Sequence, residues 1–139
     1  MNKHANFLIM TESVERLRRY LEDELGECRS EDLQGRIEEL DDLESLLDPD
    51  VISTDVETLS ALGNDTRYTL VRLLVEADGE LCVCEITPLL DVSDSAISHA
   101  LSTLADAGLV TKRKDGRWRK YRATNRANAI LAVLDGTRT

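Results

Sequence analysis

The sequence predicts a mainly α-helical fold of the winged helix-turn-helix type, in which short helices are followed by a β-hairpin, with a helical arm ahead of it. Three observations lead to this prediction. Apolar residues recur every three or four positions over most of the chain, Asp115-Gly116 is a hairpin signal between two strand-like segments, and a further helical pattern follows that hairpin. Because 139 residues with 42% hydrophobic content can bury one core, we expect one compact domain with appendages.

Residues 1–53 are expected to form an acidic helical arm. A first amphipathic helix begins at Thr11 and ends at Gly26, and a second apolar stripe runs from Leu33 to Leu47. Both stripes need a surface on which to pack. They could pack on the adjoining domain, but we favour pairing between two copies of the chain, with the arm as a dimerisation element.

Residues 54–139 are expected to form the winged domain. A first short helix precedes a second that is capped by Asn64 or Asp65, and a longer helix over residues 94–107 begins after the N-cap Ser93. A short helical element lies between the second and the long helix. Leu70, Val71 and Leu74 of the second helix are expected to point inward. The other apolar positions that mark these elements are Val56, Leu59, Leu62, Ile86, Leu89, Leu90, Ile97, Leu101 and Leu104.

A hairpin and a last helix complete this domain. Gly108 follows the long helix at the position where a left-handed C-cap is needed. Two strands, over residues 109–114 and 117–123, are joined by Asp115-Gly116, and a short helix is expected over residues 127–134. Helices, hairpin and helix in this order predict a winged helix-turn-helix.

The hairpin concentrates the positive charge of an acidic chain. The formal net charge is −10, yet residues 112–126 hold 8 Lys and Arg against 1 Asp. Because alternate residues of a strand face opposite ways, we expect one aromatic side chain, Trp118 or Tyr121, to pack on the domain while the basic tip contacts a nucleic-acid backbone or minor groove. A merely solubilising basic loop is the alternative. The residues expected to make the contacts are Arg113, Arg117 and Arg119.

The long helix over residues 94–107 has two faces of different chemistry. One face is apolar, and the other presents hydroxyl and imidazole groups without a carboxylate, since Asp94 and Asp106 lie at the ends of the helix. Small donors without negative charge suit a helix in the DNA major groove. An ordinary solvated face is the alternative, but such faces in this chain are otherwise dense in acid. The candidate DNA-reading residues are Ser95, Ser98, His99, Ser102 and Thr103.

Two thiols lie one residue apart, directly before the helix-turn-helix pattern. Pro88 is disfavoured inside a helix, so we expect Thr87 as an N-cap with Pro88 in the first helical position, which leaves Cys82-Val83-Cys84 extended. Residues i and i+2 of an extended segment point the same way, so the thiolates of Cys82 and Cys84 could converge on one soft metal ion. A pair of small, buried apolar side chains is the alternative.

Composition indicates a cytoplasmic protein without catalytic machinery. No apolar run is long enough to span a membrane, the start of the chain lacks a secretory signal, and three cysteines without disulfide spacing suit a reducing compartment. Met10 is an alternative to Met1 as the start, because it directly precedes the helix expected from Thr11. No acid, base and nucleophile cluster together, so we do not expect an enzyme. The acidic excess, with 4 Lys against 13 Arg, is similar to that of proteins from salt-accumulating halophiles.

Four stretches of the chain resemble the ArsR/SmtB family of winged-helix metalloregulators. The stretches are residues 60–67, 80–86, 92–101 and 106–110, and the second begins Glu80-Leu81-Cys82-Val83-Cys84. The resemblance implies a homodimeric repressor that binds double-stranded operator DNA and leaves it when metal binds. In that family the motif at residues 80–84 marks sensors of arsenite or antimonite and, in some branches, of cadmium or lead.

The chain departs from the arsenite-sensing pattern at one position. The family often has a third Cys three residues after the second, where this chain has Thr87. Trivalent arsenic binds three thiolates, so Cys28 of the arm is the candidate third ligand, and two thiolates completed by a small thiol or water are the alternative. Three cysteines cannot supply a four-thiolate cadmium site, which favours As(III) or Sb(III) over Cd(II) or Pb(II). The zinc and nickel sites near the last helix of other family branches are not expected, since Asp135 lacks a His partner.

The sequence therefore predicts a dimeric transcriptional repressor that needs no resident cofactor and senses an inducing metalloid through Cys82, Cys84 and Cys28. Two rival hypotheses remain. A thiol redox sensor on the same fold would release DNA when the cysteines oxidise. A winged helix that serves as a protein-interaction module would not bind specific DNA.

Overall fold

The computed structural model describes residues 7–139, with side chains from Thr11 onward, and divides into two compact units. The first unit, the arm, comprises residues 1–48, and the second, the winged domain, comprises residues 49–139. The boundary expected at 53/54 falls later than this one, because helix α3 already begins at Pro49, whose fixed φ suits a first helical position. Whether Met1 is the start of the chain lies outside the described residues.

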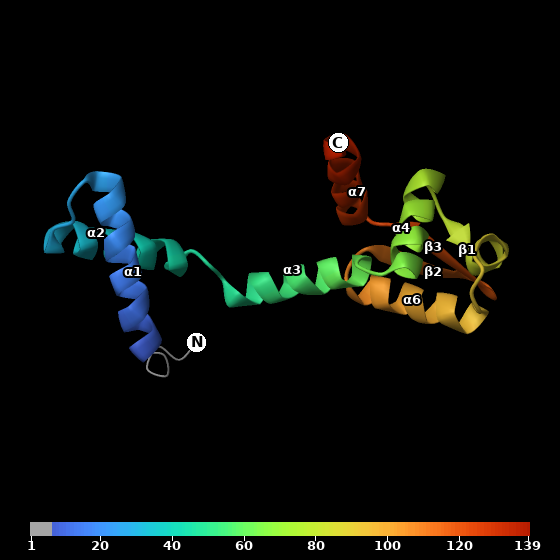
Figure 1. The fold of residues 1–139 in the computed structure, drawn as a ribbon. Helices are drawn as coiled ribbons and strands as arrows, with labels where there is room; N and C mark the ends of the chain where they lie inside the picture. The colour runs from blue at the N-terminus through green and yellow to red at the C-terminus, as the bar shows by residue number, and fades with distance from the viewer. Residues whose placement is uncertain (1–6) are drawn as a thin grey trace. The chain divides into compact units, whose positions relative to one another are not determined.

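The arm consists of helices α1 (Phe7–Leu25) and α2 (Ser30–Ser45), as the two apolar stripes predicted (Figure 1). Helix α1 begins at Phe7, before the start expected at Thr11, because no helix-breaking residue lies between Phe7 and Thr11. Gly26 ends it in the left-handed region, with a φ of +85°.

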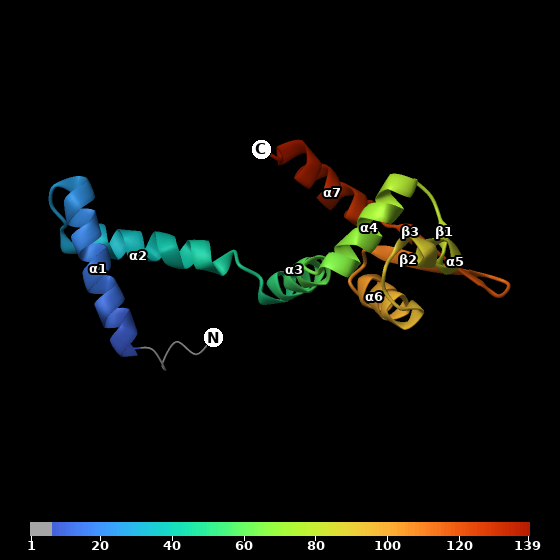
Figure 2. The same cartoon turned by 45° about the vertical axis from the view of Figure 1, so that its right-hand side comes forward.

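The two helices of the arm cross each other in both ribbon views instead of lying side by side (Figures 1 and 2). Crossing helices contact each other over a short length. Among the described side chains of the arm, Leu21 and Leu33 are the buried apolar ones. Most of the apolar stripe on α2 therefore stays accessible.

The winged domain confirms the predicted order of helices, hairpin and helix (Figure 1). Its elements are α3 (Pro49–Leu62), α4 (Asp65–Ala77), β1 (Leu81–Cys82), α5 (Val83–Ile86), the 3-10 turn η1 (Thr87–Leu89), α6 (Asp94–Asp106), β2 (Val110–Asp115), β3 (Trp118–Ala123) and α7 (Asn125–Thr137). The last helix is longer at both ends than expected from the sequence.

Side-chain caps set the starts of the three long helices after α3. Asn64 accepts a hydrogen bond from the Arg67 amide at 3.0 Å and so caps α4. Ser93 caps α6 by accepting from the Ala96 amide at 3.1 Å, as its position in the sequence predicted. Thr124 caps α7 in the same way. Each cap satisfies an amide that the helix itself leaves unpaired.

Three antiparallel strands form a small sheet in the order β1-β3-β2. The short strand β1 was not expected, because two residues carry no strand periodicity in a sequence. Asp115 pairs with Trp118, so the two-residue turn is Gly116-Arg117 rather than Asp115-Gly116. Gly116 has a φ of +61°, which agrees with hairpin turns that place glycine first.

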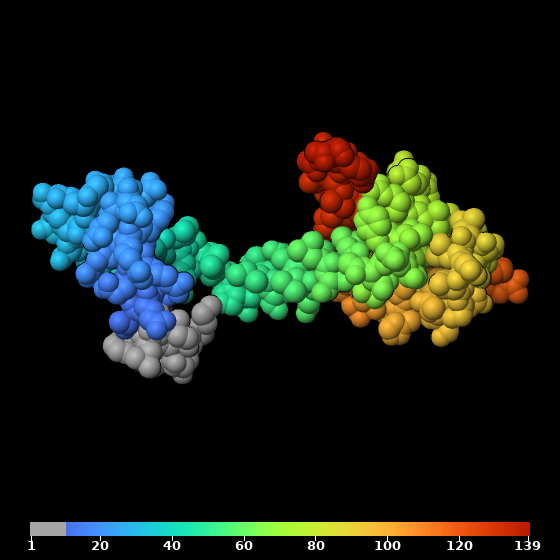
Figure 3. Space-filling view, viewed as in Figure 1, coloured from blue at the N-terminus to red at the C-terminus, as the bar shows by residue number. Residues whose placement is uncertain are grey.

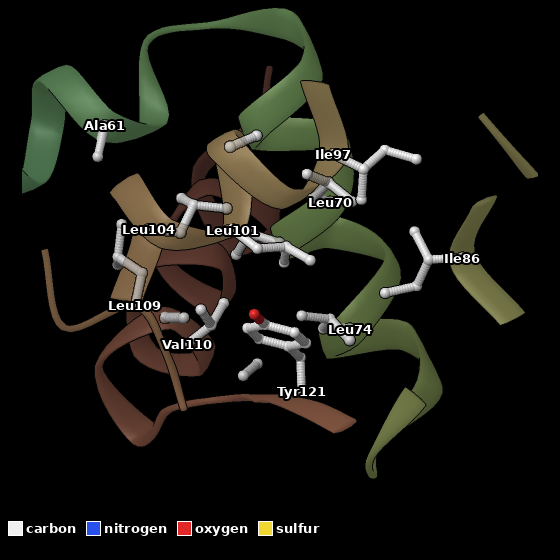
Figure 4. Packing of buried hydrophobic residues seen from close by; sticks show 14 of the residues in the cluster. Ala61, Leu70, Leu74, Ile86, Ile97, Leu101, Leu104, Leu109, Val110 and Tyr121 are labelled. Carbon is white, nitrogen blue, oxygen red and sulfur yellow. The ribbon is translucent and has the colours of Figure 1, made fainter. Parts of the chain in front are cut away.

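The core of the winged domain joins all of its long elements (Figure 4). Ile97, Leu101 and Leu104 cover one face of α6 and are fully buried, as the helical spacing predicted. Leu70 and Leu74 of α4 meet them in the same cluster. The cluster also contains Val110 and Tyr121 of the hairpin, and Ala127 and Leu131 of α7.

Two arginines of α4 fix the neighbouring helices. Arg67 donates to the carbonyl oxygens of Ala61 at 2.7 Å and Ser60 at 3.2 Å, and so caps the C-terminal end of α3. Arg72 forms two hydrogen bonds to Asp135 of α7, at 2.8 and 3.0 Å. Asp135 is therefore engaged in an ion pair, and this pair holds its pKa below the usual range of a carboxyl.

Replacing Leu101 by Ala should lower the free energy of unfolding by about 2–5 kcal/mol, because the fully buried side chain would leave a cavity. Leu89→Ala is the matched control, since Leu89 is 62% exposed, and it should change the value by less than about 0.5 kcal/mol. Urea denaturation followed by circular dichroism measures both. Equal losses for the two variants would contradict the packing described.

Candidate functional site

The helix α6 presents the polar face that the sequence predicted. Ser95, His99 and Ser102 are exposed, whereas Ser98 and Thr103 are half-buried at its edges. The Thr103 hydroxyl donates to the His99 carbonyl at 3.2 Å, so it is already used within the helix. Between Asp94 at the start of α6 and Asp106 at its end, the helix carries no carboxylate. This face can approach a polyanion and donate hydrogen bonds to it.

A groove of about 420 Å³ lies between the N-terminal ends of α4 and α6. Two helix N-termini open onto it, and helix N-termini attract phosphate through their unpaired amides. Residues of α4 that sequence reasoning missed contribute to its wall beside Ser95 and His99. They are Asn64, Thr66 and Arg67, together with the N-cap Ser93. The sequence signal that could have found them is the N-cap Asn64, since the unpaired amides at a helix N-terminus can receive a phosphate.

The strands β2 and β3 form a basic wing whose tip projects away from the helices of the domain (Figure 2). Tyr121 is 4% exposed and belongs to the core, whereas Trp118 is 45% exposed. The aromatic residue that packs on the domain is therefore Tyr121. Lys112 and Lys114 lie opposite Tyr121 and Arg119 in the strand pairing and share one face of the wing with them.

The basic residues of the wing differ in how much of their charge is already neutralised. Arg113 is held by Glu80 through two hydrogen bonds of 2.9 Å, and the pair holds the pKa of the Glu80 carboxyl below its usual range. Arg117 stacks on Trp118, with its guanidinium carbon 4.7 Å from the ring centroid. Arg119 forms no side-chain hydrogen bond or ion pair within the described part of the chain.

Lys112 and Lys114 are likewise without a side-chain partner among residues 7–139, and they lie on the same face as Arg119. Of these three cations, Arg119 was expected from the sequence to contact DNA, whereas Lys112 and Lys114 were not; the sequence favoured Arg113 as well. Arg113, which Glu80 already holds, therefore has less to offer a phosphate than the sequence alone suggested.

The thiols of Cys82 and Cys84 lie together, but not in the way that the sequence predicted. Cys82 ends β1 and is the N-cap of α5, so Cys84 is helical and the segment is not extended. The Cys82 Sγ accepts a hydrogen bond from the Cys84 amide at 3.2 Å. Thr87 is not an N-cap: it follows α5, and its hydroxyl donates to the Val83 carbonyl at 2.9 Å.

The N-cap geometry explains how two residues on one turn bring their thiols together. An N-cap residue has extended backbone angles, so its side chain folds back over the first turn of the helix. The Cys82 Sγ thus reaches the position of Cys84, and Glu85 completes the cap by accepting from the Cys82 amide at 2.9 Å. Cys82 is buried and Cys84 is exposed.

The two thiols share a hydrogen bond, which separates their acidities. The hydrogen bond with Cys84 lowers the pKa of the Cys82 thiol, and the same bond, together with burial, raises the pKa of the Cys84 thiol. Cys82 is therefore the first of the two to become a thiolate. A soft ion that bound both sulfur atoms would displace the shared proton.

Cys28 lies in the loop between α1 and α2, in the arm, and its thiol donates to the Arg29 carbonyl at 3.6 Å. In the described part of the chain, no three His, Cys, Asp or Glu side chains gather into a group that could hold a metal ion. The structure thus brings Cys82 and Cys84 together and leaves Cys28 in the other unit.

None of the described helices is both long and apolar enough to cross a membrane.

A helix-turn-helix with a polar reading helix, followed by a basic wing, defines a DNA-binding regulator. The family model described as "Bacterial regulatory protein, arsR family" matches residues 64–112, which hold the helix-turn-helix and the cysteine motif. A Halobacterium salinarum protein named as an arsenical resistance operon repressor is 56% identical over 126 residues, which cover 91% of this chain and 98% of that protein. The chain belongs to the arsR family of transcriptional regulators. The source of this relative agrees with the halophilic origin expected from the charge composition.

Solved structures confirm the winged helix-turn-helix fold. HlyU from Vibrio cholerae superposes with a TM-score of 0.58 and 28% identity, over 66% of this chain and 98% of that one. A homodimeric winged helix-turn-helix DNA-binding domain from Mycobacterium bovis gives a TM-score of 0.54 and 27% identity, over 62% and 78% of the two chains.

Removing the Cys82 thiol should make the Cys84 thiol more acidic, because the hydrogen bond that the Cys84 thiol donates to the Cys82 sulfur is the main cause of its raised pKa. The rate of Cys84 alkylation by iodoacetamide, followed by peptide mass spectrometry from acid to alkaline pH, measures this. In a Cys28→Ser background, the midpoint of the rate should move to lower pH when Cys82→Ala is added. An unchanged midpoint would show that the two thiols do not interact in solution.

Proposed function

We propose that this protein represses transcription by binding operator DNA as a homodimer, and that As(III) or Sb(III) releases it from DNA by binding Cys82 and Cys84. The observation that carries the proposal is the placement of two interacting thiols at the start of the helix-turn-helix, where Cys82 ends a strand that pairs with the wing and Cys84 lies in the first turn of α5. The high identity to a protein named as an arsenical resistance operon repressor supports the same inducer class. On this proposal the protein is a cytoplasmic regulator and not an enzyme.

Exposed apolar side chains support the homodimer. The helix α3 leaves Ile52, Val56 and Leu59 exposed at 46%, 55% and 63%, and α7 leaves Val133 and Leu134 at 63% and 44%. Figure 3 shows α3 in green with much of its surface open to the viewer. A small domain buries such faces when two copies associate. The Mycobacterium bovis domain of similar fold is homodimeric, which supports the same assembly for this chain.

The DNA would be held by two surfaces of different character. The polar face of α6, with Ser98 and His99, enters the major groove and reads base edges. The wing face that carries Lys114 and Arg119 lies along the phosphate backbone, where charge and not sequence decides the contact. In a dimer, two such helices reach half-sites one helical turn apart.

The strand pairing offers a path from the inducer to the DNA. Cys82 pairs with Lys120 of β3, and Lys120 pairs in turn with Arg113 of β2. Glu80, two residues before Cys82, also holds Arg113. A ligand that displaces the shared proton and reshapes the first turn of α5 would therefore shift the wing. A coupling free energy of about 1–3 kcal/mol would change operator affinity by roughly 5- to 150-fold.

The third ligand of a trivalent metalloid is Cys28 of the arm, or else a small thiol or water that completes a two-thiolate site. Thr87 occupies the position of the usual third Cys, and its hydroxyl is used in a backbone hydrogen bond. Cys28 has a sulfur atom that is only weakly engaged, at 3.6 Å from its acceptor. A thiolate is a far better ligand for a soft ion than a hydroxyl is.

Oxidation is a second candidate signal, and the hydrogen bond between the two thiols favours it. A thiol of lowered pKa such as Cys82 reacts more readily with peroxide. Oxidation of the pair would break the same hydrogen bond as metal binding. Operator binding measured with arsenite and with peroxide, each on reduced protein, distinguishes the two signals.

Cys82→Ser and Cys84→Ser should each bind operator DNA with wild-type affinity but fail to leave it on addition of arsenite, because a hydroxyl is a poor ligand for soft metals. Fluorescence anisotropy of labelled operator measures both properties. The matched variant Cys28→Ser separates the two third-ligand hypotheses. Arsenite affinity that drops in this variant supports Cys28, and unchanged affinity supports a two-thiolate site completed by a small thiol or water. If either Cys82→Ser or Cys84→Ser left the operator at the arsenite concentration that releases the wild type, the proposal that these thiols sense the inducer would be refuted.

Arg119→Ala should weaken binding to operator and random DNA alike and reduce the slope of log affinity against log salt by about 1, because one phosphate contact is lost. Arg113→Ala is the matched control and should have a smaller effect, since Glu80 already neutralises Arg113. Ser98→Ala and His99→Ala should instead reduce the preference for operator. The assignment is wrong if the wing variant loses only sequence preference or the helix variants keep all of it.

A further inference from the structure

The strand β3 carries two aromatic residues, and the core accounts for one of them. Tyr121 is buried, whereas Trp118, the one tryptophan of the chain, is 45% exposed. Because residues three apart on a strand point to opposite faces, Trp118 is turned away from the cluster that holds Tyr121. It pairs with Asp115 beside the turn, at the tip of the hairpin that projects from the domain (Figure 2). Packing of the core therefore does not explain a tryptophan at this position.

Arg117 covers one side of the Trp118 ring. Its guanidinium carbon lies 4.7 Å from the ring centroid, and its side chain forms no hydrogen bond or ion pair within residues 7–139. A guanidinium that stacks by its flat face keeps its N–H donors at its edge, where they remain available to a ligand. The ring also restrains a long side chain, which lowers the entropy lost on binding. Arg117 and Trp118 thus form a flat unit with a positive edge, the tip stack.

A second stack of this kind in the described part of the chain shows what is different about the tip. Arg72 of α4 lies over Tyr68, with 5.6 Å between its guanidinium carbon and the ring centroid. Arg72 is also bound by Asp135 at 2.8 Å, so its charge is used to hold α7. The tip stack has no acidic partner among the described residues, and its charge is therefore available to a molecule outside the domain.

The charges around the tip stack favour an anionic partner. Asp115 is the single acidic residue among residues 110–123, and Lys120 neutralises it through an ion pair of 3.1 Å. Lys114 and Arg119 pair with each other in the strand register next to the tip and add two further cations. A partner for this surface must offer negative charge and a wall on which a ring can pack. The minor groove of duplex DNA offers both, since it is lined by phosphates and sugars.

We propose that the tip stack enters the DNA minor groove beside each half-site, and that Trp118 makes binding depend on the base pairs found there. The minor groove is about 6 Å wide, which suits a flat unit, and A·T tracts narrow it further and attract arginine. The indole ring packs on the groove wall and holds the edge of the Arg117 guanidinium toward the bases. The inference rests on operator binding in the proposed function and is independent of the inducer. The wing thus adds sequence preference through DNA shape to its phosphate contacts.

Intrinsic fluorescence tests the contact directly, because Trp118 is the one tryptophan of the chain. The full chain is titrated with a duplex that carries the half-sites it enriches most from random DNA. Emission should be quenched on binding, and the acrylamide quenching constant should fall. Unchanged emission and quenching at saturating DNA would overturn the proposal. A ring that is protected in the free protein and becomes accessible on dilution would overturn it too, and would show that a second copy covers Trp118.

Sequence preference is measured with two duplexes that share these half-sites and differ in the flanking base pairs, which are A·T in one and G·C in the other. The wild type should prefer the A·T duplex. Trp118→Ala and Arg117→Lys should each reduce that preference roughly two- to fivefold, the range of a cation–π contact at an exposed site. Trp118→Phe keeps a ring and should keep most of the preference. Circular dichroism confirms that each variant is folded.

Two controls separate the tip stack from charge alone and from the proposed function. Arg117→Lys keeps the positive charge but cannot stack by a flat face, so full preference in this variant and in Trp118→Ala would overturn the proposal. Arg119→Ala should weaken binding to both duplexes equally. A wild type that binds the enriched half-sites no better than random DNA contradicts the proposed function. One that binds them selectively without preferring A·T flanks contradicts this inference alone.

Discussion

The winged domain depends on the burial of one face of α6. Ile97, Leu101 and Leu104 are fully buried against α4, and the hairpin joins the same cluster through Val110 and Tyr121. Because these contacts fix the helix about its own axis, the opposite face, with its hydroxyls and imidazole, has one orientation. The reading surface is thus set by apolar packing and not by any contact among the polar residues that compose it.

The same packing brings the thiol pair and the wing into one unit. The strand β1 is only two residues long, yet it pairs with β3, whose Tyr121 is anchored in the core. Cys82 then leaves the strand as the N-cap of α5, and Ile86 of α5 is buried in that core. The sulfur atoms therefore lie within one helical turn of Ile86 in the core. They also lie at the end of a strand that pairs directly with β3 of the basic wing. This closeness is what makes release of DNA by a thiol ligand physically plausible.

A small core leaves apolar surface uncovered, and this shapes the assembly. The winged domain exposes apolar residues on α3 and α7, and the arm exposes them on α2. Surfaces of this kind are stable in water when they are covered, and a second copy of the chain offers the same surface in return.

The sequence by itself determined the elements that depend on local rules. The N-cap Ser93, the left-handed Gly26 and Gly108, the inward positions of α6 and the basic hairpin all follow from residue type and spacing, and each has that role in the structure. The family resemblance carried by the cysteine motif was also readable there and agrees with the arsR family match.

Tertiary structure decided what depends on partners distant in the chain. Thr87 looked like a cap because Pro88 follows it, yet Cys82 became the cap, since β1 is held by strand pairing that a two-residue segment does not reveal. Arg113 looked like a phosphate ligand until the fold placed Glu80, 33 residues away, against it. Caps and turns depend on residues within a few positions of one another, so the sequence shows them. Ion pairs and strand pairs between distant residues form only when the core has packed and brought those residues together.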